Sequence, residues 1–333
     1  MPQVRRVCVF AWGGAAVSWE LSTPGRLVPS LATCAAFLLL ATGCALHIRR
    51  GLVAELRRSQ EIAGAAQRAL LRPMPRRMEG LTLAAAQLSA SRGAAVGGDL
   101  YEAVPTVHGV RVVIGDVRGH GLPALGAAAA VLGAFREAAY DERSLGGVLV
   151  RMERALGRHV RDRARSEHPA ACPAEPESPS AEEFVTVLLL QIAPDGTLLA
   201  LNCGHPWPYL LRSRGSAPDP APHVTALRPT RVHLLDGGET MPPLGVVPVP
   251  ADPRPYPCGE LRPGETLFLH TDGAEEARDA AGAFFPLRSV LAEATAPLTP
   301  ARLVAGVHAA LLRHTGGRLA DDVALLVLRD DRT

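Results

Sequence analysis

The chain has 333 residues, of which 47% are hydrophobic, 20% charged and only 4% aromatic. This length accommodates one large domain or two small ones, with a core built mainly from aliphatic side chains. The 35 basic residues, all of them arginine, nearly balance the 33 acidic residues and leave a formal net charge of +2. That balance argues against a nucleic-acid-binding protein, which carries a strongly basic face.

A long apolar segment lies near the N-terminus. Residues 27–48 carry no charged side chain, and about 20 such residues cross the hydrocarbon core of a bilayer as a helix. Arg49 and Arg50 follow directly, and the positive-inside rule places that end in the cytoplasm. We therefore predict an anchor in the inner (cytoplasmic) membrane, with the rest of the chain in the cytoplasm. The alternatives are a buried core helix and a signal peptide, which would start earlier and carry a cleavage site.

A second apolar stretch, residues 7–19, is shorter and ends at Glu20. Residues 22–26 would form a tight external turn between two spans. A hairpin with both ends in the cytoplasm is the preferred topology, and a single span is the alternative. We assign residues 1–50 to this anchor of one or two transmembrane helices.

Residues 51–75 are rich in alanine and charged side chains and indicate a helical linker. Pro73 and Pro75 end it, because proline cannot continue the hydrogen-bond ladder of a helix. Residues 76–330 are then predicted to form a folded domain, in which short apolar runs replace the long ones.

This region alternates between runs typical of strands and of helices. Strands are expected at residues 81–88, 110–117, 184–192, 197–204, 209–212, 232–235, 266–270 and 323–328. Helices are expected at residues 122–140, 145–160, 287–293 and 300–313. The Asp195-Gly196 pair between two apolar runs predicts a β-hairpin, and residues 163–183, rich in Pro, Glu and Ser, predict a flexible insertion. Sheets covered by helices account for this tally, although periodicity alone leaves the architecture open.

Acidic residues recur at the edges of these apolar runs, next to glycine or to a second aspartate. The positions are Asp99, Asp116, Asp272 and the pair Asp321–Asp322. Carboxylates at strand ends can converge at one end of a sheet core, and such hard oxygen ligands suit magnesium or manganese and not zinc. Each position alone is weak, because Asp-Gly is also ordinary turn chemistry.

Taken together, the motifs resemble one family. In chain order they read AAVGGDLYEA, IGDVRGHGLPA, FVTVLLLQIAPDGTLLALNCGHPWPYLL, PPLGV, LRPGETLFLHTDGAEEARD and DDVALLVL. They are similar to the motifs of the metal-dependent serine/threonine protein phosphatases of type 2C, in the bacterial branch resembling stage II sporulation phosphatase E. The resemblance implies an α+β fold with a central β-sandwich of two antiparallel sheets flanked by helices, a four-layer αββα arrangement.

The resemblance also implies roles for the aspartates. Asp116 would bridge two divalent metal ions, Mn2+ or Mg2+, with the backbone carbonyl of Val117 assisting one of them. Asp272 and Asp321 would hold the first ion, and Asp99 would bind on the side of the second, directly or through water. Two cations close together lower the pKa of a water molecule toward neutrality.

Other residues near these motifs receive smaller roles. Asp322 is expected to brace the site without binding the metal. His120 is the candidate general acid for the leaving oxygen, with a locally bonded loop histidine as the alternative. Arg118 is a candidate for steering phosphate, whereas Arg92 is expected to be a solvated surface residue. His205 is expected to shape a loop near the site.

The expected function is a phosphoserine/phosphothreonine protein phosphatase. Its substrate would be a phosphorylated protein, an anti-sigma-factor antagonist in a partner-switching system, and the resemblance alone supplies that partner. The alternatives are a catalytically inactive, membrane-bound interaction domain and a membrane sensor coupled to the phosphatase domain. Fold by itself does not decide between them.

Overall fold

The computed structural model of the chain describes residues 27–88, 97–119, 121–167, 183–212, 230–235, 237–294 and 298–332. It divides into two compact units, Met1–Ser59 and Gln60–Thr333. The domain limits predicted at residues 50 and 75 stay predictions. The predicted second span at residues 7–19 and the turn at residues 22–26 lie outside the described residues.

The described part of the first unit is helical. Helix α2 (Leu27–Leu70) has 44 residues without a break, so the predicted span and the predicted linker form one continuous helix. Its segment Ala35–Glu55 is long and apolar enough to cross a membrane, with a mean hydropathy of 1.4 and no part of the window buried. The end of α2 belongs to the second unit, where Gln67 Nε2 donates a hydrogen bond to the Gly97 backbone oxygen at 3.2 Å.

The second unit contains two antiparallel sheets. One has six strands in the order β1-β2-β11-β10-β7-β8, and the other has five in the order β3-β4-β5-β6-β9. The strands of the first are β1 (Arg77–Met78), β2 (Leu81–Leu88), β11 (Val323–Asp330), β10 (Thr266–His270), β7 (Tyr209–Arg212) and β8 (Arg231–Leu234). Those of the second are β3 (Leu100–Thr106), β4 (Gly109–Val117), β5 (Val185–Ile192), β6 (Thr197–Cys203) and β9 (Tyr256–Glu260).

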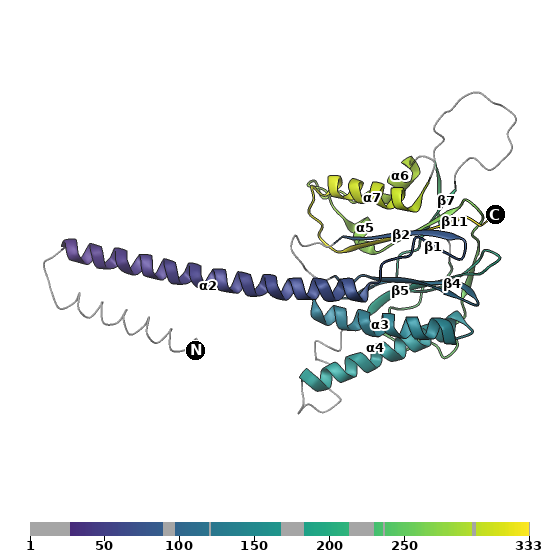
Figure 1. Cartoon of the computed structure of the whole chain (residues 1–333), viewed down its shortest axis with the longest axis horizontal. Coiled ribbons are helices and arrows are strands. Elements are labelled where there is room, and N and C mark those ends of the chain that lie inside the picture. Colours follow the sequence, from purple (N-terminus) through teal and green to yellow (C-terminus); the bar gives the residue numbers. More distant parts are fainter. Residues whose placement is uncertain are drawn as a thin grey trace, which may run out of the picture. The chain divides into compact units, whose positions relative to one another are not determined.

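Helices cover the outer face of each sheet (Figure 1). Helices α3 (Leu122–Asp141) and α4 (Leu145–Glu167) pack on the five-stranded sheet. Helices α5 (Asp272–Glu276), α6 (Leu287–Glu293) and α7 (Pro300–His314) lie on the six-stranded sheet. A third apolar core fills the space between the sheets. The order helix, sheet, sheet, helix confirms the predicted α+β sandwich.

Strand β4 shows how the sequence specifies these layers. Val112 and Ile114 face the core between the sheets, whereas Val113 and Val117 face α3 and α4. Side chains alternate between the two faces of a strand, and here both faces are covered, so the strand reads as an almost unbroken apolar run. Arg111 is the exception within it, and its guanidinium is completely buried.

The structure corrects the sequence prediction at several elements. Strand β3 was missed because it contains Pro105, which is tolerated since β3 lies at the edge of its sheet. Strand β9 was missed because it is another edge strand and is mostly exposed; the short elements β1 and α5 were also missed. The insertion predicted to begin at residue 163 begins later, because α4 continues to Glu167.

Candidate metal centre

Two of the predicted aspartates meet through the pairing of β3 with β4. Leu100 pairs with Gly115, so Asp99, which precedes β3, lies beside Asp116 near the end of β4. The chain approaches closely here, because a Cβ atom at Gly98 would lie 2.7 Å from Asp116 Oδ1 and would also strike the Val117 backbone oxygen. Only glycine fits at position 98 without displacing one of these oxygens.

The other aspartates meet through the pairing of β10 with β11. His270 pairs with Leu325, which brings Asp272, just after β10, next to Asp321 and Asp322, just before β11. The Gly273 N–H donates to Asp272 Oδ1 at 2.9 Å, and the Asp322 N–H donates to Asp321 Oδ1 at 2.8 Å. These backbone bonds orient the two carboxylates.

Contacts between the sheets bring the two groups of aspartates together. A Cβ atom at Gly97, which precedes β3, would lie 2.5 Å from Asp322 Oδ2, which precedes β11. The Thr271 side chain, which follows β10, forms a hydrogen bond with Asp99. Asp99, Asp116, Asp272, Asp321 and Asp322 therefore share one end of the sandwich.

Asp99 is the most deeply buried of these carboxylates. Its side chain is 2% exposed, and its Oδ2 atom has no hydrogen-bond partner among the described residues. Burial raises the pKa of Asp99 well above its usual value, and the charges of Asp116, Asp322 and Asp272 raise it further, against a smaller lowering by the Thr271 hydrogen bond. One hydrogen bond compensates only in part for an ionised carboxylate buried among like charges.

The carboxylates of the two sheets repel one another. Burial, followed by the charges of Asp272, Asp321 and Asp322, raises the pKa of Asp116 to about 7. Burial, followed by the charges of Asp321 and Glu276, raises the pKa of Asp272. Like charges so placed disfavour one another's ionisation, and a bound cation would reverse this effect.

The donors fit a hard divalent cation. They are carboxylate oxygens together with the Val117 backbone oxygen beside Gly98, and Mg2+ or Mn2+ prefers such oxygens. Within the described residues, no group of three or more His, Cys, Asp or Glu side chains is arranged to hold a metal ion as it stands. The unpartnered Asp99 Oδ2 and the mutual repulsion are the observations that favour a cation there.

The remaining predicted residues fall into three cases. His120 and Arg92 lie outside the described residues. Arg118 is exposed, and its guanidinium carbon lies 5.4 Å from the centre of the Phe184 ring. The backbone N–H of Arg118 donates to the Phe184 backbone oxygen at 2.9 Å. His205 is buried in a loop near the aspartates.

One residue of the site was not singled out from the sequence. Thr271 accepts a hydrogen bond from the Ala324 N–H at 2.9 Å through its hydroxyl, in addition to its bond with Asp99. It therefore joins β11 of one sheet to an aspartate at the start of β3 in the other. Its position directly before Asp272 was the only signal in the sequence.

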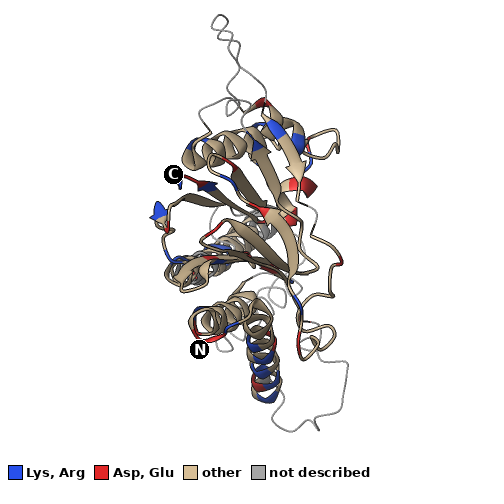
Figure 2. Cartoon of the chain, turned by 90° about the vertical axis from the view of Figure 1, so that its right-hand side faces the viewer, with Lys and Arg blue, Asp and Glu red and all other residues tan. Residues whose placement is uncertain are grey.

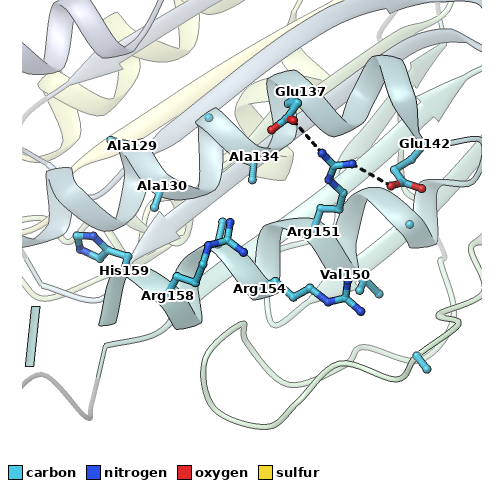
Figure 3. Close-up of a pocket in the computed structure, with 14 residues that line it drawn as sticks. Ala129, Ala130, Ala134, Glu137, Glu142, Val150, Arg151, Arg154, Arg158 and His159 are labelled. Carbon is cyan, nitrogen blue, oxygen red and sulfur yellow. Dashed lines mark hydrogen bonds and ion pairs between the residues drawn. The ribbon is translucent and has the colours of Figure 1, made fainter. Parts of the chain in front are cut away.

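A surface groove of about 860 Å³ lies elsewhere, between α3 and α4 (Figure 3). Small residues of α3 and arginines of α4 line it, and Arg151 forms ion pairs with Glu137 at 2.9 Å and Glu142 at 3.3 Å. Arginines gather along α4 (Figure 2). None of the five clustered aspartates lines this groove, so its shape does not mark the acidic site.

The fold is similar to that of bacterial type 2C phosphatase domains. The SiaA-PP2C domain of Pseudomonas aeruginosa is similar, with a TM-score of 0.55 and 18% identity over 85% of this chain and 98% of that one. The PP2C phosphatase domain of SpoIIE from Bacillus subtilis, with a fragment of its regulatory domain, gives a TM-score of 0.52 and 13% identity over 75% and 62% of the two chains. Likenesses at these identities show the fold alone.

A further similar structure contains the RsbU and RsbW domains of a Mycobacterium tuberculosis protein. Its TM-score is 0.51 at 22% identity, over 76% of this chain, and the chain spans only 61% of that one. No curated protein matches the chain.

The class of protein is therefore a PP2C-type serine/threonine phosphatase domain. The family model of stage II sporulation protein E (SpoIIE) matches residues 106–331, and the chain belongs to this family. This confirms the resemblance noted from the motifs.

Proposed function

We propose that the domain is an active, metal-dependent phosphoserine/phosphothreonine protein phosphatase. The observation that carries this proposal is the convergence of aspartates from both sheets, two of them buried and two half-buried, with burial and like charges raising the pKa of Asp116 to about 7. A cluster of this kind, at the end of a sandwich, costs stability unless a cation binds it. Perturbed carboxylates of this type gather at functional sites.

We assign the ligands as follows. Asp116 would contribute a carboxylate to both of two divalent ions, Mn2+ or Mg2+, and the Val117 backbone carbonyl would assist at one of them. Asp272 and Asp321 would hold the first ion, and Asp99 would act on the side of the second. When bound, such ions supply an activated water for attack on phosphorus and offset the charge of the phosphoryl oxygens.

The chain's own residues orient these donors. The Asp322 N–H fixes one oxygen of Asp321 at 2.8 Å, and Thr271 holds Asp99 from the opposite sheet. We propose that His120 protonates the leaving seryl or threonyl oxygen, and that Arg118 binds a phosphoryl oxygen through its guanidinium. Stacking on Phe184 supports Arg118 in that role.

For the substrate, we propose a phosphorylated anti-sigma-factor antagonist. Support comes from the SpoIIE family membership and from the similar structure that holds an RsbU and an RsbW domain in one protein. Incubation of the full chain with each candidate phosphoprotein from the same cell tests the assignment. Loss of phosphate from one antagonist and not from unrelated phosphoproteins is expected, and equal or absent release from all of them would contradict it.

For the location, we propose that α2 anchors the domain to the cytoplasmic side of the inner membrane. Ala35–Glu55 is long and apolar enough, and none of that window is buried. The arginines after residue 48 favour a cytoplasmic C-terminal end. A reporter fused after Arg58 is expected to give a cytoplasmic signal, and a periplasmic signal would overturn this topology.

The catalytic proposal is tested by phosphate release from p-nitrophenyl phosphate with Mn2+. Asp116→Ala and Asp272→Ala are each expected to abolish turnover, because each removes a proposed ligand. Asp252→Asn is the matched control, since Asp252 is exposed in a loop, and its turnover should equal that of the wild type. Turnover like that of the wild type in either alanine variant would contradict the ligand assignment.

The alternative is a catalytically inactive, membrane-bound interaction domain. The retained cluster of five aspartates speaks against it, because carboxylates that repel one another cost stability in a domain that binds no cation. A folded wild-type chain that stays inert with both Mn2+ and Mg2+ would favour this alternative.

A further inference from the structure

A buried histidine connects the two sheets next to the aspartates. His205 follows β6 and is 4% exposed. Its Nδ1 lies 3.1 Å from Thr186 Oγ1 in β5, and its Nε2 lies 3.1 Å from the backbone oxygen of His270 at the end of β10. Strands β5 and β10 belong to different sheets, so the ring joins the sheets through both of its nitrogens.

The partners of the ring fix its tautomer. The His270 backbone oxygen only accepts hydrogen bonds, so Nε2 of His205 carries a proton. Burial, followed by the charge of His270, lowers the pKa of His205 to about 3, so the ring is neutral and its Nδ1 accepts a hydrogen bond. The Thr186 hydroxyl donates it, because Oγ1 lies 3.1 Å from Nδ1 and 3.4 Å from its other acceptor, the Asp116 backbone oxygen. Thr186 Oγ1 is then left to accept the Asp116 N–H, which lies 3.3 Å away.

These bonds form one chain of donors and acceptors. It starts at the Asp116 N–H, passes through the Thr186 hydroxyl and the His205 ring, and ends at the His270 backbone oxygen. Asp272 follows His270 by two residues. The chain therefore links the backbone at one clustered aspartate to the strand end that carries another.

The turn that carries the ring is itself fixed. The His205 N–H donates to Asn202 Oδ1 and Asn202 Nδ2 donates to the His205 backbone oxygen, both at 2.8 Å. Gly204 between them has φ +71, and a Cβ atom there would lie 2.8 Å from Pro243 Cγ. The ring is thus presented by a closed turn, which gives it a defined position.

We propose that His205 is a positioning residue of the metal centre. It holds the end of β4 and the end of β10 at the separation that lets carboxylates from both sheets share the same ions. The inference rests on the proposed function, because the ions belong to that proposal. Without the link, like charges on the two strand ends would push them apart, while each sheet keeps its own helix-covered core.

The test is a calorimetric titration of the full chain in detergent with Mn2+. We expect His205→Leu to weaken Mn2+ binding by about 10–100-fold, the usual effect of removing a residue that orients metal ligands. His205→Gln keeps one donor and one acceptor and should restore most of the affinity. Thr186→Val should weaken binding in the same direction, and the double variant should bind no more weakly than His205→Leu, because both substitutions break one chain.

His314→Leu is the matched control. His314 Nε2 lies 3.0 Å from the Ala283 backbone oxygen, so it makes the same kind of bond as His205, but it joins the end of α7 to the segment before α6 and does not link the two sheets. Its loss should leave the Mn2+ affinity unchanged.

The outcomes separate this inference from the proposed function. If the wild type binds Mn2+ and folded His205→Leu binds it equally well, His205 has only a structural role and the inference is wrong. If the wild type binds no Mn2+, the proposed function fails and the inference fails with it. Nitrogen NMR measures the tautomer of the His205 ring without metal. A proton on Nε2 is expected, together with an Nδ1 chemical shift that changes in Thr186→Val. A proton on Nδ1 would overturn the inference.

Discussion

Strand β4 carries a charged residue near each end, Arg111 and Asp116, and the two lie in opposite electrostatic surroundings. Near its start, Arg111 is fully buried, and every nitrogen of its guanidinium donates a hydrogen bond. The acceptors are Gln191 Oε1 at 2.9 Å and the backbone oxygens of Ala139 at 2.9 Å, Glu142 at 2.6 Å and Arg143 at 3.0 Å. Near its end, Asp116 lies among carboxylates that raise its pKa to about 7.

The difference separates a structural charge from a functional one. Arg111 donates hydrogen bonds to the free carbonyl groups at the C-terminal end of α3 and contributes to stability, as cations do at that end of a helix. The charges that act on Asp116 are of its own sign, so the protein alone destabilises it. Burial by itself does not mark a site, whereas burial among like charges points to a missing partner.

The largest expected effect comes from replacing Arg111, whose guanidinium nitrogens all donate hydrogen bonds. Arg111→Met keeps an apolar stem but removes the donor from the buried Ala139 carbonyl and from the part-buried bonds to the Glu142 and Arg143 carbonyls. A buried polar group left without a partner costs about 1–3 kcal/mol. We therefore expect the free energy of unfolding to fall by about 3 kcal/mol or more. Urea unfolding followed by circular dichroism measures this loss.

Arg154→Met is the control for that prediction. Arg154 is exposed on α4, and a surface substitution of this kind changes stability by no more than about 0.5 kcal/mol. A similarly small loss in Arg111→Met would mean that the buried guanidinium contributes little to stability, and the contrast along β4 would disappear.

A smaller effect of opposite sign is expected at the other end. In the metal-free chain at pH 8, Asp116→Asn removes a charge that its neighbours repel, and it should raise the free energy of unfolding by on the order of 1–2 kcal/mol after allowance for solvent screening. The same substitution should abolish turnover. Unfolding in the presence of a chelator measures the gain, with Asp252→Asn as the control.

Much of the fold was predictable because local patterns carry it. The apolar run of β4, the helical period of α3 and the Asp195-Gly196 turn gave the right elements. That turn closes as expected, with Gly196 at φ +93 and the Thr197 N–H donating to Asp195 Oδ1 at 2.9 Å. Strand β3 was not predicted because proline within a run argues against a strand, except at the edge of a sheet. Which strand lies at the edge depends on tertiary pairing, and the local sequence does not show it.

The site was predictable to a lesser degree. The aspartates were found because each borders an apolar run beside glycine or aspartate, and the resemblance supplied their roles. Their convergence depends on the register of β3 with β4 and of β10 with β11, which no local pattern states. The bonds of Thr271 and His205 cross between sheets, so the sequence could indicate only that His205 shapes a loop near the site.

The smallest predicted effect is the pH dependence of the Asp116→Asn gain. Because the pKa of Asp116 is about 7 in the folded chain against an ordinary 3.8, the folded state holds more protons between these values. The stability of the metal-free wild type should therefore fall as pH rises through this window. His205 acts in the opposite direction, because its pKa is lowered to about 3 from 6.5 and its contribution is lost as pH falls through that range.

Subtracting the wild type from the variant isolates Asp116, because both chains contain His205. The gain in the free energy of unfolding should be close to zero near pH 4, should grow through the window in which only the folded wild type is protonated, and should level off above about pH 7. Thermal unfolding of both chains with a chelator, at steps of pH, measures this curve. A gain that is constant across the range would mean that Asp116 stays ionised throughout, so that repulsion by the carboxylates of the other sheet is not what destabilises this end of β4.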